Sequence, residues 1–372
     1  MQTVEMGTKL NTIQEAIEDI KAGKVIIVVD DEDRENEGDF LTAARNVTPE
    51  IINFMATHGR GLICAPLIED ECDRLGLEMM VQSNSAAYET PFTVSIDLIG
   101  HGCTTGISAS DRAKTVQALI NPSTQPEELG KPGHIFPLRA KKGGVLRRAG
   151  HTEAAIDLAK MAGFEPAGVI VEIMNEDGTM ARLPELLEIA KKFDLKIVSI
   201  ADLISYRLKN ESLIEKIVQT ELKTIWGEFK LVAFRQTTTD EEHLAFVKGE
   251  WEKDEPVLVR VESSSFTHNL LDAIRSDKQS NLSAALKKIN EEGKGLLIFM
   301  QQEEKQIGII EKLRAYNGET LTRTDKKDYG IGAQILHHFN ISKLRLITNS
   351  DPANNPVIHA YGFEVTEVIP FN

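Results

Sequence analysis

An acidic run at residues 30–39 follows directly on a β-branched apolar segment at residues 25–29. The run places seven carboxylates and one arginine in ten positions. Because like charges at this density repel one another, we expect a loop whose charge is offset by cations or by water. A loop at the carboxyl end of a buried strand is where open α/β sheets usually bind ligands. Carboxylates there suit Mg2+ or Mn2+, and a solvated charged loop is the alternative.

Apolar runs typical of buried strands alternate along the chain with segments of helical periodicity. In the first half, helical patterns near 12–22, 48–58, 109–120, 152–162 and 183–193 separate strand-like runs at 25–29, 61–67, 90–98, 134–140 and 168–174. Residues 121–133 contain three prolines and are expected to form a loop. The alternation predicts an α/β (α+β) fold.

The length of 372 residues suggests two domains, since single domains usually contain about 100–200 residues. Around residues 207–224 a polar segment of helical pattern leads into a new set of strands. We therefore place the boundary at residue 208, giving domains of residues 1–207 and 208–372. Lys and Arg number 21 in each part, whereas Asp and Glu number 32 in the first and 25 in the second. The acidic excess lies mainly in the first domain.

Charge and cysteine content exclude several classes of protein. The net charge of −15 argues against nucleic acid or an anionic membrane as the main partner. No apolar stretch approaches the roughly 18 residues that span a bilayer, and no signal-peptide pattern opens the sequence, so a cytoplasmic protein is expected. Cys64, Cys72 and Cys103 do not resemble a disulfide framework, and we expect reduced, partly buried thiols.

A basic, glycine-containing turn at residues 146–152 precedes a helix that is expected to begin near Thr152. Backbone amides at the start of a helix can bind an anion, and Arg147 and Arg148 add positive charge. From this position His151 could reach a metal ion or a phosphate group. A glycine cap with two exposed arginines is the alternative interpretation.

Two more polar residues occur beside apolar strand segments. Glu172 interrupts the run 168–174, and a carboxylate on a buried strand usually has a partner or a raised pKa. His134 lies between a glycine and an apolar strand, where a histidine is often purely structural. A polyacid loop, an isolated Glu, two His and an anion-binding turn together fit metal-assisted enolisation of a sugar phosphate.

Several long strings between residues 8 and 207 closely resemble the 3,4-dihydroxy-2-butanone 4-phosphate synthases of riboflavin biosynthesis. They occur in the order in which that family has them, which makes the resemblance highly specific. The strings are DDEDRENEGDF, MATHGRGLICAPL, TPFTVSID, TTGISASDRAKTV, PGHIFPLRA, GGVLRRAGHTEAAIDLAKMAGF and EIMNEDGTMAR.

The resemblance implies conversion of D-ribulose 5-phosphate to L-3,4-dihydroxy-2-butanone 4-phosphate and formate. It implies a homodimer with a mixed sheet and with two Mg2+ (or Mn2+) ions in each active site. His134 and Glu172 correspond to catalytic residues, and Glu35 and His151 correspond to metal ligands. Ala149 departs from the family, which often has glycine there, but both residues are small. The substrate-binding residues implied are Arg34, Glu35, Asp39, Arg148, Ala149, Gly150, His151, Thr152 and Glu172.

The mechanism implied by the resemblance begins with chelation of the C2 carbonyl and C3 hydroxyl oxygens of the substrate by the two ions, which acidifies the C3 proton. A carboxylate or a water molecule in the acidic loop then removes that proton. Loss of the C1 hydroxyl, a skeletal shift and release of C4 as formate would follow. Glu172 and His134 are the expected proton carriers.

The C-terminal half resembles GTP cyclohydrolase II, the usual fusion partner of this synthase, in VLVRVES, LSAALKKINEEGKGLL and DYGIGAQIL. That family binds a catalytic Zn2+ with three cysteines. The corresponding positions here are Ser265, Ser276 and Lys278, and no cysteine follows Cys103. Because hydroxyls and an ammonium group cannot replace three thiolates, we expect no zinc and an inactive domain.

Alternatives for this half remain open. A bifunctional enzyme with residual GTP cyclohydrolase II activity would bind zinc and turn over GTP. A regulatory or dimerisation module would need neither. A catalytically silent scaffold is disfavoured for the whole chain because the motifs of the first half are intact. The pair His337 and His338 is expected to form a polar, solvent-facing helix end rather than a metal site.

Overall fold

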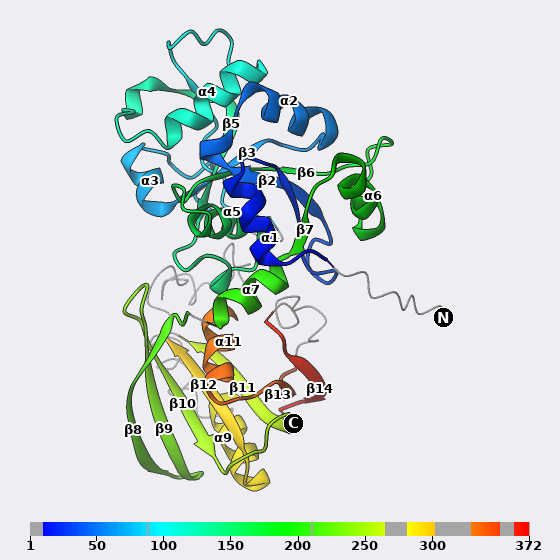
Figure 1. The fold of residues 1–372 in the computed structure, drawn as a ribbon. Coiled ribbons are helices and arrows are strands. Elements are labelled where there is room, and N and C mark those ends of the chain that lie inside the picture. The colour runs from blue at the N-terminus through cyan, green and yellow to red at the C-terminus, as the bar shows by residue number, and fades with distance from the viewer. Residues whose placement is uncertain are drawn as a thin grey trace. The chain divides into compact units, whose positions relative to one another are not determined.

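The computed structural model describes residues 10–86, 88, 90–209, 211–264, 281–301, 329–349 and 361–371. The chain divides into two compact units, Met1–Arg207 (unit 1) and Leu208–Asn372 (unit 2). Each unit is built from one sheet and several helices (Figure 1). The α/β (α+β) fold expected from the sequence is therefore confirmed.

Unit 1 contains a mixed sheet whose described strands follow the order β4-β5-β3-β6-β2-β1-β7. These strands are β1 (Ile26–Val29), β2 (Gly38–Ala43), β3 (Cys64–Ile68), β4 (Ile96–Leu98), β5 (Leu129–Ala140), β6 (Gly168–Glu172) and β7 (Ile197–Ser199). β1 pairs antiparallel with β2 and parallel with β7. β3 pairs parallel with β5 and antiparallel with β6. The acidic run is thus the connection between two antiparallel neighbours, neither of which is an edge strand.

Several helices of unit 1 begin at residues whose side chains cap the first turn. Thr48 caps α2, where its hydroxyl accepts a hydrogen bond from the amide of Ile51 at 3.3 Å. Thr12 and Glu15 form a capping box at the start of α1. The helices are α1 (Ile13–Lys21), α2 (Pro49–His58), α3 (Glu69–Arg74), α4 (Ala109–Leu119), α5 (His151–Met161), α6 (Leu183–Phe193) and α7 (Ile200–Leu208), with short 3-10 turns η1 (Ala44–Asn46), η2 (Pro126–Glu128) and η3 (Gly144–Leu146).

Helix α5 is buried along most of its length and packs against β2, β3 and β6. Small side chains make this close approach possible, since Ala154, Ala155 and Ala159 are fully buried. A Cβ added at Gly168 would lie only 2.8 Å from the Cβ of Ala155. The first turn of α5 is consequently fixed beside the sheet, which places His151 next to the acidic run.

Two strand predictions in unit 1 were wrong in extent. Residues 90–98 were predicted as one strand, but only Ile96–Leu98 forms β4. Upstream of it the amide of Thr93 donates to Pro137 and the amide of Val94 donates to Glu78, so no single partner strand builds a continuous ladder. Conversely, β5 begins at Leu129, inside the segment that was predicted as a loop because of its prolines. Its first residues pair with β4 across a bulge.

Unit 2 contains a second sheet, whose described strands follow the order β14-β13-β11-β12-β10-β9-β8. Its apolar core lies between this sheet and helix α9, around Phe229, Leu258 and Ile289. The elements are β8 (Ile214–Thr224), β9 (Gly227–Gln236), β10 (Glu242–Lys248), β11 (Pro256–Ser264), α9 (Asn281–Glu292), β12 (Gly295–Gln301), α11 (Tyr329–His338), β13 (Lys343–Ile347) and β14 (Glu364–Ile369).

The polar segment 207–224 is not the helical connection that its sequence suggested. Helix α7 ends at Leu208, and residues Ile214–Thr224 form the edge strand β8, which pairs antiparallel with β9. Most of β8 is exposed, so its residues do not show the alternation of apolar and polar side chains that marks a half-buried strand. Pairing with β9, rather than burial, makes this segment a strand.

The histidine pair of α11 is only half solvent-facing. His338 is exposed, whereas His337 is partly buried and its Nε2 lies 2.9 Å from the carbonyl oxygen of Tyr361. Burial lowers the pKa of His337. The positions predicted to replace the zinc cysteines, Ser265, Ser276 and Lys278, lie outside the described residues. In the part of the chain that the structure describes, no helix is long and apolar enough to cross a membrane.

Candidate active site

A pocket of about 100 Å³ lies in unit 1, where the acidic run, the first turn of α5 and the end of β6 meet. It brings together seven of the residues predicted from the sequence to bind substrate or metal. It leaves out His134, and neither Ala149 nor Gly150 is among its lining side chains. The lining residues are Arg34, Glu35, Glu37, Asp39, Cys64, Thr90, Phe92, Leu138, Arg148, His151, Thr152, Ile170 and Glu172.

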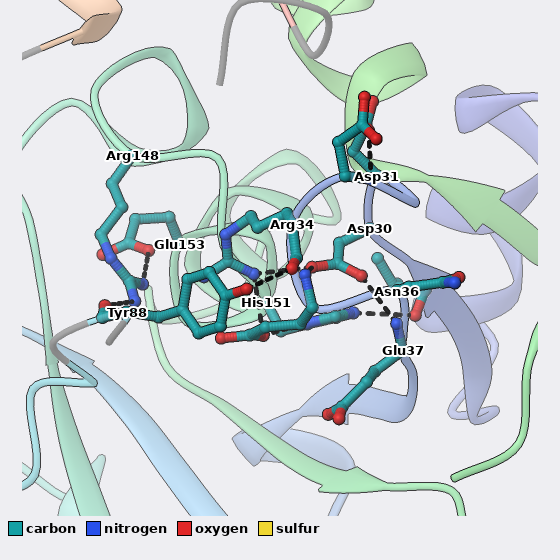
Figure 2. A network of polar contacts seen from close by, with 12 residues as sticks. Asp30, Asp31, Arg34, Asn36, Glu37, Tyr88, Arg148, His151 and Glu153 are labelled. Carbon is teal, nitrogen blue, oxygen red and sulfur yellow. Dashed lines mark hydrogen bonds and ion pairs between the residues drawn. The ribbon is translucent and has the colours of Figure 1, made fainter. Parts of the chain in front are cut away.

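Residues 30–37, named the acidic loop here, connect β1 to β2 as a hairpin that is organised around one carboxylate. Asp30 Oδ2 accepts hydrogen bonds from Arg34 Nη1 at 2.8 Å and from the amide of Glu35 at 3.1 Å. Asp30 Oδ1 accepts one from the amide of Glu37 at 2.8 Å. Only 1% of the Asp30 side chain is exposed, so this buried carboxylate takes the place of water as the hydrogen-bond acceptor for the loop (Figure 2). Asp30 was not among the site residues predicted from the sequence.

A set of donor atoms suited to a divalent cation lies at the inner end of this loop. Atoms of Asp30, Glu35 and His151 lie within 4.8 Å of one another, and Glu35 Oε2 is 3.9 Å from His151 Nδ1. His151 Nε2 lies 3.1 Å from the carbonyl oxygen of Val28, which can only accept, so Nε2 carries the proton and Nδ1 has a free lone pair. Burial lowers the pKa of His151, which favours the neutral imidazole that binds metal. The residues therefore fit a hard divalent ion.

Two arginines of the pocket come from different loops and meet at one tyrosine (Figure 2). The guanidinium of Arg34 lies over the ring of Tyr88 at 5.3 Å, and the Tyr88 hydroxyl donates to the carbonyl oxygen of Arg34. Arg148 Nη2 donates to the carbonyl oxygen of Tyr88 at 3.1 Å, and Arg148 Nη1 donates to Glu153 at 2.7 Å. Helix α5 begins at His151, one residue before the predicted start. Arg148 therefore lies in the turn that leads into its N-terminus. This arrangement suits a phosphate group.

Three further carboxylates line the pocket, and none of them forms a salt bridge with a described residue. Asp39 and Glu172 are direct partners in the β2–β6 pairing. Burial, and then the charge of Glu172, raise the pKa of Asp39 well above its usual value. Burial, followed by the charges of Glu35 and Glu172, raises the pKa of Glu37 to about 7. So much uncompensated negative charge requires bound cations, protons or both.

Glu172 is held in place by the backbone of a neighbouring loop. Its Oε2 accepts a hydrogen bond from the amide of Leu62 at 2.8 Å. A Cβ at Gly61 would lie 2.4 Å from the same carboxylate oxygen, so only glycine permits this approach. Cys64 lies in the same wall, and burial raises the pKa of its thiol well above the usual value, as expected for an inert reduced cysteine.

His134 lies on β5, away from the residues that line the pocket. Its Nδ1 is 2.7 Å from Asp97 Oδ2, and its amide donates to Asp97 Oδ1 at 2.9 Å. The side chain of His134 is 44% exposed. The Asp97 carboxylate therefore fixes the orientation of the imidazole ring.

Sequence reasoning missed Asp30, Glu37 and Asp97. Glu37 could have been found from the sequence, because acidic residues stand at every second position, 35, 37 and 39. In an extended chain such residues point to the same side. Asp30 could not be told from the other acids of the run, because its role depends on how the loop folds around it. Asp97 gave no signal, since its hydrogen bond to His134 forms only when β4 and β5 pair.

Comparison with known families agrees with the two resemblances noted from the sequence. Residues 14–206 match the family model of 3,4-dihydroxy-2-butanone 4-phosphate synthase, and residues 215–370 match that of GTP cyclohydrolase II. The riboflavin biosynthesis protein RibBA of Cytophaga hutchinsonii is 58% identical over 97% of this chain and 92% of that protein. RibBA of Aquifex aeolicus is 50% identical over the same shares.

One solved structure is similar to the whole chain and another to its first unit. RibBX, a two-domain 3,4-dihydroxy-2-butanone 4-phosphate synthase from A. baumannii, covers 97% of this chain and 99% of its own, with a TM-score of 0.66 and 39% identity. A 3,4-dihydroxy-2-butanone 4-phosphate synthase in complex with two magnesium ions covers 54% of this chain and 98% of its own, with a TM-score of 0.52 and 40% identity. The chain belongs to the 3,4-dihydroxy-2-butanone 4-phosphate synthase family and carries a second domain of the GTP cyclohydrolase II family.

Proposed function

We propose that unit 1 converts D-ribulose 5-phosphate to L-3,4-dihydroxy-2-butanone 4-phosphate and formate. The observation that supports this best is the meeting of a metal-donor pair, Glu35 and His151, with the paired carboxylates Asp39 and Glu172 in one pocket. A relative in this family was solved with two magnesium ions. Divalent ions held by Glu35 and His151 would polarise the carbonyl and hydroxyl oxygens of the sugar and so acidify the proton between them.

The chain's own residues divide the remaining work among binding, orientation and proton transfer. Arg148 and the first amides of α5 hold the phosphate group, because cationic donors and a helix N-terminus converge there. Asp39 and Glu172 hold the sugar hydroxyls. Arg34 orients Glu35, whose Oε2 lies 2.8 Å from Arg34 Nη1.

Glu37 is the best candidate in the acidic loop for the base that accepts the C3 proton. Its carboxylate lines the pocket, and no described residue donates a hydrogen bond to it. Its pKa of about 7 is close to the pH at which a general base works best, because such a group is partly ionised and still basic enough to accept a proton. Glu172 would then carry a later proton.

His134 can take part only in a homodimer, and we propose that it completes the pocket of a second copy. It is held by Asp97 but does not line the pocket of its own chain. Exposed apolar side chains that would be covered in such a dimer are Leu62, Met79, Met80, Val81, Ile99 and Ile107, each at least 40% exposed. We propose that these side chains join in one apolar patch at the dimer interface, because contiguous exposed apolar patches mark interaction sites.

The proposed reaction predicts metal-dependent formate release. Purified full-length chain with ribulose 5-phosphate and Mg2+ is expected to release formate and the four-carbon phosphate in equal amounts. EDTA should lower the rate at least a hundredfold, because the acidified C3 proton depends on the bound cation, and excess Mg2+ should restore it. Formate can be measured with formate dehydrogenase. Turnover that is unaffected by EDTA would contradict the metal assignment, and no turnover with any divalent ion would contradict the reaction.

For unit 2 we propose a domain without GTP cyclohydrolase activity and without zinc. The support is chemical: no cysteine follows Cys103, and thiolates are the ligands that this family uses for zinc. RibBX, which matches 97% of the chain, is described as a two-domain 3,4-dihydroxy-2-butanone 4-phosphate synthase. The RibBA relatives favour the alternative of a bifunctional enzyme. A role of unit 2 in regulation or dimerisation is compatible both with an inactive domain and with a bifunctional enzyme.

Metal analysis and a GTP assay separate these two possibilities. We expect less than about 0.1 zinc per chain after dialysis, since a site without thiolates loses most of its affinity. We also expect GTP consumption at least a thousandfold below that of an authentic GTP cyclohydrolase II measured alongside. Stoichiometric zinc together with formate release from GTP would establish the bifunctional enzyme instead.

A further inference from the structure

The acidic loop is held by a second charged residue that the proposed mechanism does not use. Arg182 precedes α6, and its Nη1 donates to the carbonyl oxygen of Glu35 at 3.1 Å and also to that of Asn36. We propose that Arg182 is a positioning residue, which fixes the two peptide groups that direct Glu35 and Glu37 into the pocket. This role would explain the arginine that ends the string EIMNEDGTMAR.

The two peptide groups, Glu35–Asn36 and Asn36–Glu37, each form hydrogen bonds through both their C=O and their N–H. In the first, the carbonyl of Glu35 accepts from Arg182, and the amide of Asn36 donates to Asp31 at 3.2 Å. In the second, the carbonyl of Asn36 accepts from Arg182, and the amide of Glu37 donates to Asp30 Oδ1 at 2.8 Å. A peptide group is planar, so fixing its C=O and its N–H fixes the plane and the directions in which the chain leaves it.

The backbone turns sharply at Asn36. Its φ of +55° lies in the left-handed region, which is costly for most residues and which asparagine enters more readily than other non-glycine residues. Without Arg182 neither carbonyl beside Asn36 would keep its charged donor, and the loop could relax by rotating a peptide. Such a rotation would turn the Glu35 side chain away from His151. In the structure Glu35 Oε2 lies 3.9 Å from His151 Nδ1.

Arg182 is itself held in place by the start of α6. Its own amide donates to Glu185 Oε2 at 3.0 Å, at the start of α6. Helix α6 also packs directly on the end of the acidic loop, because a Cβ at Gly38 would lie 2.4 Å from Leu186 Cδ1. The guanidinium therefore reaches the loop from a helix that packs on the start of β2, and one of its nitrogens, Nη1, donates to both carbonyls.

This inference deepens the proposed function, because it concerns the loop that carries the metal ligand Glu35. It can nevertheless be tested without substrate or metal. Full-length chains with Arg182→Met and Arg182→Lys would be compared with the parent and with Arg45→Met. Arg45 is a suitable control because it is paired with Glu165, is 53% exposed and does not line the pocket. Three quantities would be measured: hydrogen exchange of the loop amides in metal-free protein, Mn2+ affinity by electron paramagnetic resonance, and melting temperature.

We expect Arg182→Met to accelerate exchange of the loop amides and to weaken Mn2+ binding, each about tenfold, with a melting temperature close to that of Arg45→Met. Arg182→Lys should restore both quantities to within about threefold, since an ammonium group can donate to both carbonyls. Parent-like loop exchange in a folded Arg182→Met chain would overturn the proposal. Weaker Mn2+ binding without faster exchange would also overturn it, because Arg182 would then act through its charge alone.

Two other outcomes are decisive as well. If Arg182→Met does not fold, the Lys variant decides: its failure to restore loop exchange and Mn2+ affinity would overturn positioning in favour of a purely structural role. If the parent neither binds Mn2+ nor releases formate, yet Arg182→Met still accelerates loop exchange, the proposed function fails and the positioning role of Arg182 stands.

Discussion

Replacing Glu35 by Gln, or His151 by Ala, is expected to lower formate release at least a thousandfold and to weaken Mn2+ binding in the same variants. The reason is that Glu35 Oε2 and His151 Nδ1 are 3.9 Å apart and are the pair to which the cation is assigned. Removing one ligand loses several kcal/mol of transition-state stabilisation, and each factor of ten corresponds to about 1.4 kcal/mol. Steady-state formate assays and Mn2+ titrations measure the two effects.

A neighbouring carboxylate provides the matched control. Glu32 is exposed in the same loop and does not line the pocket, so Glu32→Gln makes the same change of charge at a position outside the ligand set. We expect it to keep activity within about threefold of the parent, because exposed charges interact weakly through water. A Glu35→Gln chain that releases formate at the parental rate would remove Glu35 from the metal site.

Mixed dimers of two inactive variants are expected to regain activity. Chains with His134→Ala and chains with Glu172→Gln should each fall below about 1% of parental turnover, because each lacks a proposed proton carrier. If His134 serves the pocket of the second copy, a mixed dimer contains one complete pocket. Random pairing then restores about a quarter of the parental rate, since half of the dimers are mixed and half of their pockets are intact.

The cis arrangement gives the opposite result, which makes the experiment decisive. If His134 serves its own chain, the mixture stays inactive. As a control, chains carrying both substitutions are mixed with parental chains: about a quarter of the rate should remain if His134 acts across the dimer, and about half if it acts within one chain. Native mass spectrometry of the mixture would verify that chains have exchanged.

Local patterns predicted most helices and the central strands of the sheet. The helices at Pro49–His58 and Leu183–Phe193 were recognisable because their caps and apolar spacing arise from contacts within a few residues. The strand Ile26–Val29 was recognisable because all four residues are buried and β-branched. The edge strand Ile214–Thr224 was missed because most of it is exposed. Its strand character comes from a partner that local sequence does not reveal.

For the site, the sequence predicted the chemistry better than the geometry. The acidic loop and the basic turn were singled out as candidate cation and anion sites, each with a solvent-exposed alternative, and the structure brings them into one pocket. It does not bring His134 there. Nothing in the sequence separates a histidine that faces its own pocket from one that faces outward, because that depends on the register between β4 and β5 and on Asp97.

The sequence by itself determined the inventory: a carboxylate-rich hairpin, a basic helix start, a strand glutamate and a second half without cysteines after Cys103. These are properties of composition and short-range spacing, which the chain carries whether folded or not. The tertiary structure alone decided which of the acids share a pocket, which nitrogen of His151 is free, and that Asp30 and Arg182 hold the loop between them. Those outcomes depend on strand order and burial, because desolvation and hydrogen-bond partners are set by residues far apart in the chain.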